Sequence, residues 1–120
     1  MEKNILPHNH NEKFEENFEH MPKLSEFAVI ADVFKLLGDC TRVRLFWILC
    51  HCEECVLNLS VMMDMSSPAI SHHLKLLKVC GLITSRREGK EMYYKAAETE
   101  QAQALHIMIE KIVQIACPKT

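Results

Sequence analysis

The sequence predicts a mainly α-helical domain with one small β-hairpin, and three observations support this fold class. Apolar residues recur at helical spacing through most of residues 12–80 and again through residues 98–116. Between these stretches, residues 82–95 change to a period of two around a polar turn, which is typical of a hairpin. With 120 residues, 48% of them hydrophobic, the chain has the size and composition of a protein with one modest core.

The N-terminal segment differs in composition from the rest of the chain. Residues 1–11 contain Pro7 and a polar run without apolar periodicity, which predicts a flexible arm, and residues 12–117 are predicted to form one domain. No apolar run reaches the roughly 18 to 20 residues that a membrane-spanning helix requires. The first residues also lack the pattern of a signal peptide. We therefore expect a cytoplasmic protein that does not bind a membrane.

Two helices are expected in the first third of the chain. Phe14 and Phe18 fall one helical turn apart among glutamates, which predicts a short amphipathic helix over residues 12–20. A longer helix is predicted over residues 25–37, with Ser25 as its N-cap. The apolar stripe of this helix and the glycine that ends it are Phe27, Ile30, Ala31, Phe34, Leu37 and Gly38.

The next two helices are expected over residues 41–49, ending near His51, and over Val56–Met63. Asp39 is placed to cap the first of them, because a short carboxylate side chain can accept a hydrogen bond from the free N–H groups of a first helical turn. The residues of this helix that we expect to be buried are Val43, Phe46 and Trp47, with Cys50 as a further candidate.

A short turn then leads into a further helix. Ser66, Ser67 and Pro68 combine a serine N-cap with a proline in the first turn, which predicts a helix over Pro68–Lys78 that ends before Gly81. Two helices that meet through such a short turn form a helix-turn-helix. The side chains of the second helix that are predicted to face inward are Ile70, Leu74 and Leu77.

The C-terminal third completes the predicted fold. Residues 82–86 and 91–95 are expected to pair as strands around the basic turn 87–90, and a long helix is expected over residues 98–116. A helix-turn-helix followed by a basic hairpin is a winged helix, so the sequence predicts a winged helix-turn-helix. The apolar positions of the last helix are Ala102, Leu105, Ile109, Ile112 and Val113.

Charge and residue type indicate where nucleic acid would bind. The formal net charge is −2, but residues 66–95 hold six basic residues against two acidic ones, so positive charge is concentrated locally. A helix that reads the major groove requires short polar or basic residues near its N-terminus, and a basic hairpin can lie along the phosphates. The candidate DNA-binding residues are Ser66, Ser67, Ser71, His72, His73 and Lys75 in the helix, and Arg86, Arg87 and Lys90 in the hairpin.

Four stretches, residues 37–45, 54–59, 71–77 and 87–90, resemble the ArsR/SmtB family of winged-helix repressors, and the resemblance spans about residues 27–96. It implies a homodimer that represses an operon by binding double-stranded operator DNA. It also implies release from that DNA when an inducer, often a metal ion, binds.

The resemblance places the dimer interface on the first and last helices. Residues 12–20 and 98–116 fit this role, because both are amphipathic segments with little core of their own and need a partner to cover their apolar faces.

A cluster of thiols is the first candidate inducer site. Soft thiolates suit zinc, cadmium, lead or arsenite. The family's thiolate site, however, has two cysteines flanking one residue, and here Leu57 occupies the second position. The alternative interpretation is that these cysteines are packing residues or merely exposed. The cluster comprises Cys50, His51, Cys52 and Cys55, which His8 or His10 from the arm could join.

The family's other metal site lies on the last helix and pairs carboxylates with histidines. His106 and Glu110, one helical turn apart, are candidates for a displaced version across the dimer, and the alternative is a solvated His–Glu pair. We expect no metal site at the family's usual positions, because a charged lysine cannot bind a metal ion. The positions that match it are Glu98, Glu100, Lys111 and Gln114.

Other functions remain open at this point. Thiol oxidation that involves Cys40, a cluster cysteine or Cys117 could switch the same fold, or DNA binding could be constitutive. A zinc-stabilised interaction module without DNA binding is a further alternative. An enzyme is disfavoured, because the chain has three glycines, no phosphate-cradling loop and little room for a substrate cavity.

Overall fold

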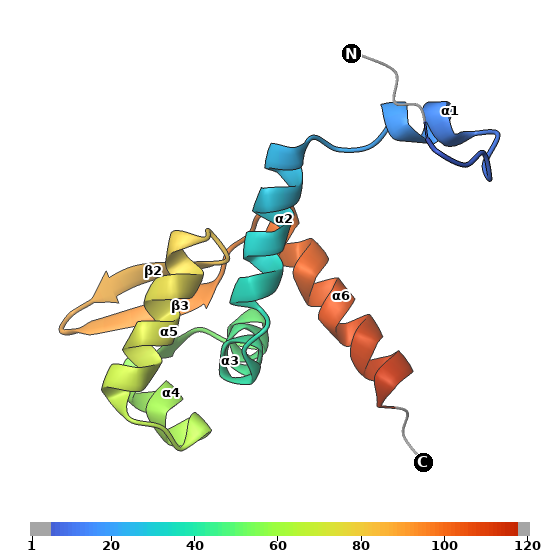
Figure 1. Cartoon of the computed structure of the whole chain (residues 1–120). Helices are drawn as coiled ribbons and strands as arrows, with labels where there is room; N and C mark the ends of the chain where they lie inside the picture. The colour runs from blue at the N-terminus through green and yellow to red at the C-terminus, as the bar shows by residue number, and fades with distance from the viewer. Residues whose placement is uncertain (1–5, 118–120) are drawn as a thin grey trace. The chain divides into compact units, whose positions relative to one another are not determined.

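A computed structural model describes residues 6–117 and divides the chain into two units, one up to Asp32 and one from Val33 onward. Six helices and three short strands make up the described residues, which confirms the predicted fold class (Figure 1). In chain order the elements are α1 (Phe14–Glu19), α2 (Leu24–Leu36), α3 (Cys40–His51), β1 (Glu54–Cys55), α4 (Val56–Met63), α5 (Ser67–Val79), β2 (Ile83–Glu88), β3 (Glu91–Ala96) and α6 (Glu100–Ala116).

The first unit contains the arm, α1 and most of α2. The first five residues of the predicted arm lie outside the described residues, and residues 6–11 contain no helix or strand, so arm flexibility stays a prediction. The expected N-cap of α2 is wrong. The backbone N–H of Lys23 donates to a carboxylate oxygen of Glu26 at 2.9 Å, and Ser25 already lies inside the helix. In this arrangement the side chain of a glutamate three residues after the N-cap accepts from the backbone N–H of the capping residue itself.

The core of the second unit lies between α3, α5 and the hairpin. Leu45 and Phe46 of α3 are fully buried in one cluster with Leu74 and Leu77 of α5, and α3 contacts both α5 and β3. As predicted, Asp39 caps α3, since its carboxylate accepts from the backbone N–H of Arg42 at 3.0 Å. Because α3 is anchored at its N-terminus and buried along one face, it fixes the position of the helix that follows the turn.

One residue of α3 differs from expectation. Trp47, predicted to be buried, is 40% exposed, and Val43 is only half-buried. Leu45, Phe46 and Leu49 occupy the core side of the helix, so Trp47 lies on the other side and its indole faces α6. The error arose because apolar character alone does not say which of several apolar stripes faces the core.

The helix-turn-helix forms as predicted, and the bounds of α4 match the expected Val56–Met63. The turn passes through Asp64, whose φ of 52° is a left-handed conformation that aspartate tolerates better than most residues. Ser66 caps α5 by accepting from the backbone N–H of Ala69 at 3.3 Å. At the other end, Gly81 has a φ of 76°, which lets Leu82 N–H bond back to the carbonyl of Leu77 and closes the helix.

The hairpin is longer than predicted and belongs to a three-stranded antiparallel sheet in the order β1-β3-β2. Gly89 and Lys90 form its two-residue turn, and the positive φ of Gly89 (62°) suits the first position of such a turn. Sequence reasoning missed β1, in which Cys55 lies opposite Tyr93. A two-residue strand has no periodicity of its own to detect.

α6 begins at a Thr99 cap and is buried only through Ala102 and Leu105. Beyond Leu105 its apolar side chains are largely exposed. They are Ile107, Met108, Ile112, Val113 and Ile115. None of the helices within residues 6–117 combines the length and apolar composition needed to cross a membrane.

The Asp39 cap predicts a pH-dependent contribution to stability. The hydrogen bond from Arg42 N–H lowers the pKa of Asp39 below its ordinary value of 3.8. The bond therefore stabilises the fold above that ordinary pKa and is lost as the pH falls through the lower folded-state pKa. In Asp39→Asn the amide keeps the cap but does not titrate. In urea unfolding at fixed protein concentration, the difference in unfolding free energy between wild type and Asp39→Asn should be constant above about pH 5. Below that pH the wild type should lose stability relative to the variant. A difference that is independent of pH would contradict this role.

Candidate nucleic-acid interface and metal-ligand cluster

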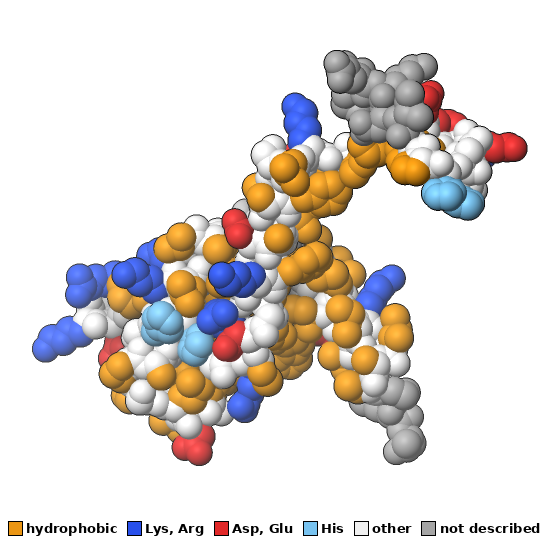
Figure 2. All heavy atoms as spheres, viewed as in Figure 1, with side chains coloured by type: hydrophobic (Ala, Val, Ile, Leu, Met, Phe, Trp, Pro, Cys, Tyr) orange, Lys and Arg blue, Asp and Glu red, His pale blue; other side chains and the backbone are white. Residues whose placement is uncertain are grey.

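The first turns of α5 present the predicted reading residues together. Ser71, His72 and Lys75 are exposed, and Ser67 is half-buried beside the Ser66 cap. Lys and Arg side chains gather over α5 and the β2–β3 hairpin on the face shown in Figure 2, with histidines beside them. The fold therefore brings the two predicted DNA-binding segments to one face.

His73 has different surroundings from its neighbour His72. It is half-buried, and its Nδ1 atom is buried without a hydrogen-bond partner in the described part of the chain. This position favours a role in supporting α5 over contact with a base, while its predicted DNA contact stays untested.

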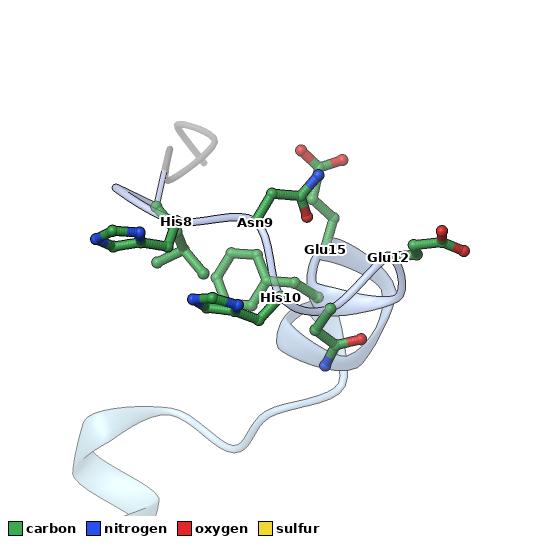
Figure 3. Close-up of a pocket in the computed structure, with 8 residues that line it drawn as sticks. His8, Asn9, His10, Glu12 and Glu15 are labelled. Carbon is green, nitrogen blue, oxygen red and sulfur yellow. The ribbon is translucent and has the colours of Figure 1, made fainter.

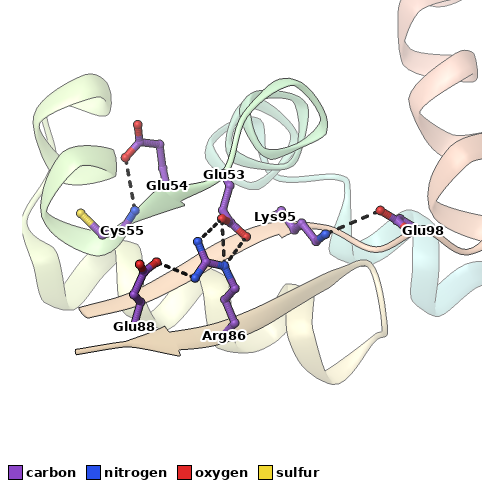
Figure 4. A network of polar contacts seen from close by, with 7 residues as sticks. All are labelled: Glu53, Glu54, Cys55, Arg86, Glu88, Lys95 and Glu98. Carbon is purple, nitrogen blue, oxygen red and sulfur yellow. Dashed lines mark hydrogen bonds and ion pairs between the residues drawn. The ribbon is translucent and has the colours of Figure 1, made fainter. Parts of the chain in front are cut away.

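Arg86 is held inside the protein's own polar network (Figure 4). Its guanidinium donates to both carboxylate oxygens of Glu53, at 2.6 to 3.1 Å, and to Glu88 at 2.6 Å. The ring of Tyr93 lies 5.0 Å from the guanidinium carbon. The hydrogen bond from Arg86 lowers the pKa of Glu53, and the two carboxylates raise the pKa of Arg86. Two carboxylates thus neutralise the charge of Arg86. Its hydrogen bonds to Glu53 tie the hairpin to the loop after α3.

The other two basic residues of the hairpin are available to a partner. Arg87 and Lys90 are exposed, and neither has an ion pair among residues 6–117. Lys95, at the base of the hairpin, lies 3.6 Å from Glu98. The positive charge that the hairpin offers to phosphate is therefore concentrated in Arg87 and Lys90 at its tip.

The predicted thiol cluster does not converge on a common point. Within the described residues, no group of three ligand atoms close enough for one ion includes a cysteine. Cys55 is buried in β1, Cys52 is exposed, and Cys50 is half-buried. Burial, aided by the charge of Glu110, raises the pKa of Cys50 to about 11, and burial with Glu54 raises the pKa of Cys52. Both thiols are thus disfavoured as thiolates.

The histidines of the arm are described within the first unit. His8 and His10 stack with their ring centroids 5.5 Å apart and line a hollow beside Glu12 (Figure 3). Their predicted approach to the cysteines would join the two units, so it stays a prediction.

Three side chains of the second unit converge where α3 ends against α6. His106 Nε2 lies 3.1 Å from His51 Nε2 and 3.2 Å from Glu110 Oε1, and the His51 to Glu110 distance is 3.4 Å. His106 and Glu110 are the predicted pair on the last helix, whereas His51 was predicted only as a member of the thiol cluster, and its contact with this pair was missed. Its position at a helix end gave no signal, because the contact joins residues 55 positions apart.

Trp47 supports this cluster from α3. Its indole N–H donates to Glu110 Oε1 at 2.9 Å, and its ring packs on His51 with centroids 4.2 Å apart. The hydrogen bond from Trp47 is the main cause of a lowered pKa at Glu110, against the opposing effect of burial, and His106 and His51 lower it further. The carboxylate is therefore ionised and held in place at neutral pH.

Comparisons with known proteins all indicate the same family. A sequence profile described as "bacterial regulatory protein, arsR family" matches residues 39–85. The arsenical resistance operon repressor of Escherichia coli K12 is 36% identical over 85 residues, which cover 70% of this chain and 73% of that protein. A cadmium resistance regulatory protein CadC homolog of Staphylococcus aureus is 42% identical over 66 residues, and the match spans 54% of each chain.

A solved structure also matches over most of the chain. The homodimeric winged helix-turn-helix DNA-binding domain Mb0332 of Mycobacterium bovis, a possible ArsR-family regulator, aligns with a TM-score of 0.69 and 26% identity. The alignment covers 78% of this chain and 85% of that domain. These matches confirm the winged helix-turn-helix and the family resemblance predicted from sequence.

The Glu53–Arg86 contact predicts how firmly the hairpin is held. Glu53→Gln removes the carboxylate that Arg86 grips, so amide hydrogen exchange in β2 and β3 should rise roughly two- to fivefold, as expected for one partly exposed ion pair. Glu98→Gln is the matched control, because it removes the looser contact with Lys95 at 3.6 Å and should change exchange less. Equal effects of the two variants would show that the Glu53 contact does not anchor the hairpin.

Proposed function

Because this chain belongs to the arsR family of bacterial regulatory proteins, we propose that it is a sequence-specific DNA-binding repressor. It acts as a homodimer in the cytoplasm, where its operator lies, and a metal ion releases it from that operator. The observation that carries the proposal is that Ser71, His72 and Lys75 of α5 and Arg87 and Lys90 of the hairpin are exposed, on the two segments over which basic side chains gather in Figure 2. The family match favours this regulator over the enzyme alternative.

DNA recognition divides between the two segments by chemistry. Serine, histidine and lysine side chains at the start of α5 can hydrogen-bond to base edges in the major groove. Arg87 and Lys90, at the hairpin tip, suit phosphate contacts or the adjacent minor groove. If two copies of α5 are related by a dyad, the operator is an inverted repeat with half-sites about 34–36 Å apart, or a multiple of that spacing.

The dimer would cover the exposed apolar face of α6. Ile112 and Val113 project from the helix beyond the core, next to an apolar hollow that Val43 and Trp47 line with Ile109. Contiguous exposed apolar surface of this kind is typical of an association site. The Mycobacterium bovis neighbour is described as homodimeric, which supports the same assembly here.

A metal ion is proposed as the effector because relatives of this chain are named for resistance to cadmium and to arsenicals. Those names do not specify the ion for this chain. Within the described residues its cysteines do not converge with two other ligands on one point. Release would follow if the ion favours a dimer geometry in which the two α5 helices no longer fit successive major grooves.

The hairpin tip gives a direct test of DNA binding. Arg87→Ala with Lys90→Ala should weaken binding to DNA from the protein's own promoter. It should also reduce the slope of log K against log salt by about 2, or about 0.9 for each lost phosphate contact. Fluorescence anisotropy across a salt series measures both effects. Lys13→Ala with Lys23→Ala removes the same charge elsewhere and should leave the slope nearly unchanged. An unchanged slope in the hairpin variant would remove the hairpin from the interface.

The apolar face of α6 gives a test of assembly. Ile112→Asp places a charge on the surface that the dimer would bury, so the dimer dissociation constant should rise at least about tenfold. Sedimentation velocity across a concentration series measures it. Gln101→Asp, at an exposed polar position on the same helix, is the control and should dimerise like the wild type. A dimer that tolerates Ile112→Asp would place the interface elsewhere.

A further inference from the structure

We propose that His51, His106 and Glu110 form a binding site, within one chain, for a divalent transition metal ion of the zinc, cobalt or nickel class. Occupancy of this site lowers the affinity of the protein for its operator. The second statement rests on the proposed function, and the first stands without it.

The spacing of the three ligand atoms fits one ion. A tetrahedral site with metal–ligand bonds of about 2.0–2.1 Å places its ligand atoms about 3.3–3.4 Å apart. The observed separations are 3.1 Å between the two Nε2 atoms, 3.2 Å from His106 to Glu110 and 3.4 Å from His51 to Glu110. An ion can therefore enter with small side-chain rotations and no movement of the helices.

The three ligand atoms of the cluster carry lone pairs that a cation could use. Two neutral imidazoles that face each other through Nε2 can share only one proton between these atoms. Glu110 Oε1 already accepts from Trp47 and is also within reach of both histidines. The lone pairs of the two Nε2 atoms and of Glu110 Oε1 thus lie close together, and one bound cation could accept all three.

Trp47 acts as the positioning residue of the site. Its indole N–H orients the Glu110 carboxylate, and its ring holds the imidazole of His51. Contacts of this kind behind a ligand commonly change metal affinity by 10- to 100-fold. The unexpected exposure of Trp47 then has a reason, since the residue faces the cluster in place of the core.

Access and ligand type define the ion. The side chains of His51, His106 and Glu110 are 44%, 28% and 41% exposed, so an ion can arrive from solvent and keep an open coordination position for water. Two imidazoles and a carboxylate suit borderline ions such as Zn²⁺, Co²⁺ and Ni²⁺ better than arsenite or lead, which prefer thiolates. The site shares His51 with the predicted thiol cluster but includes none of its cysteines, and it differs from the positions that match the family's C-terminal site.

The location of the site connects the two parts that a repressor must couple. His51 ends α3, which packs against α5, whereas His106 and Glu110 lie on α6, whose outer half carries the proposed dimer face. An ion that joins these ligands links the angle between α3 and α6 to the position of the reading helix. This is a differential contact of the kind that shifts a two-state equilibrium.

Cobalt(II) titration of the full-length reduced protein tests the site without DNA. We expect one Co²⁺ per chain, with the intense visible d–d bands of four-coordinate cobalt and without a thiolate-to-cobalt charge-transfer band. His51→Gln and His106→Gln should each weaken binding at least about 100-fold, whereas Trp47→Phe should weaken it about 10- to 100-fold. His20→Gln, at an exposed histidine outside the cluster, and Cys50→Ser with Cys52→Ser should bind like the wild type. A charge-transfer band, or tight binding that survives His106→Gln, would overturn the site.

Anisotropy with promoter DNA tests the effector role separately. Saturating Zn²⁺ should lower the DNA affinity of the wild type about 5- to 150-fold and should leave that of His51→Gln nearly unchanged. Cobalt binding without any change in DNA affinity would contradict the effector role and leave the site intact. Absence of specific DNA binding by the metal-free protein would instead contradict the proposed function, whatever the cobalt spectrum shows.

Discussion

Leu45, Phe46 and Leu49 hold one face of α3 in the core, and the positions of the other functional elements follow from this packing. The helix contacts α5, β3 and α6, and Asp39 fixes where it begins. With one face buried, the opposite face must present Trp47 and His51 outward, toward α6. The same helix therefore supports the reading helix from its buried face and contributes to the ligand cluster from its exposed face.

Local signals predicted most of the fold because they act within a few residues. The Asp39 and Ser66 caps, the glycine that ends α5 and the change to a period of two at the hairpin are each readable from adjacent side chains. The errors arose where two solutions satisfy the same local rule. Glu26 satisfies the start of α2 where Ser25 was expected to, and a two-residue β1 forms only because β3 lies beside it.

In the candidate sites, too, features formed by neighbours in sequence could be predicted, and contacts between distant residues could not. Exposed polar residues in one turn of α5 and a basic hairpin are neighbours in sequence, so the face that we propose binds DNA could be recognised from sequence. The internal hydrogen bonds of Arg86 could not be predicted from sequence, because its partner Glu53 lies 33 positions away. For the same reason, the dense run of cysteines drew attention to thiolate chemistry, whereas the ligand atoms that converge come from His51 and from a helix that begins 49 positions later.

The arrangement also explains why metal binding and dimer assembly should be thermodynamically linked. On α6, Glu110 lies beside the apolar residues Ile109 and Val113, and all three line the apolar hollow between α3 and α6. Trp47 lines the same hollow and donates to Glu110 of the cluster. A partner that covers this hollow removes water from the edge of the cluster, which strengthens every electrostatic contact there. By reciprocity, an ion that fixes Trp47 and α6 changes the free energy of association by the same amount as association changes the affinity for the ion.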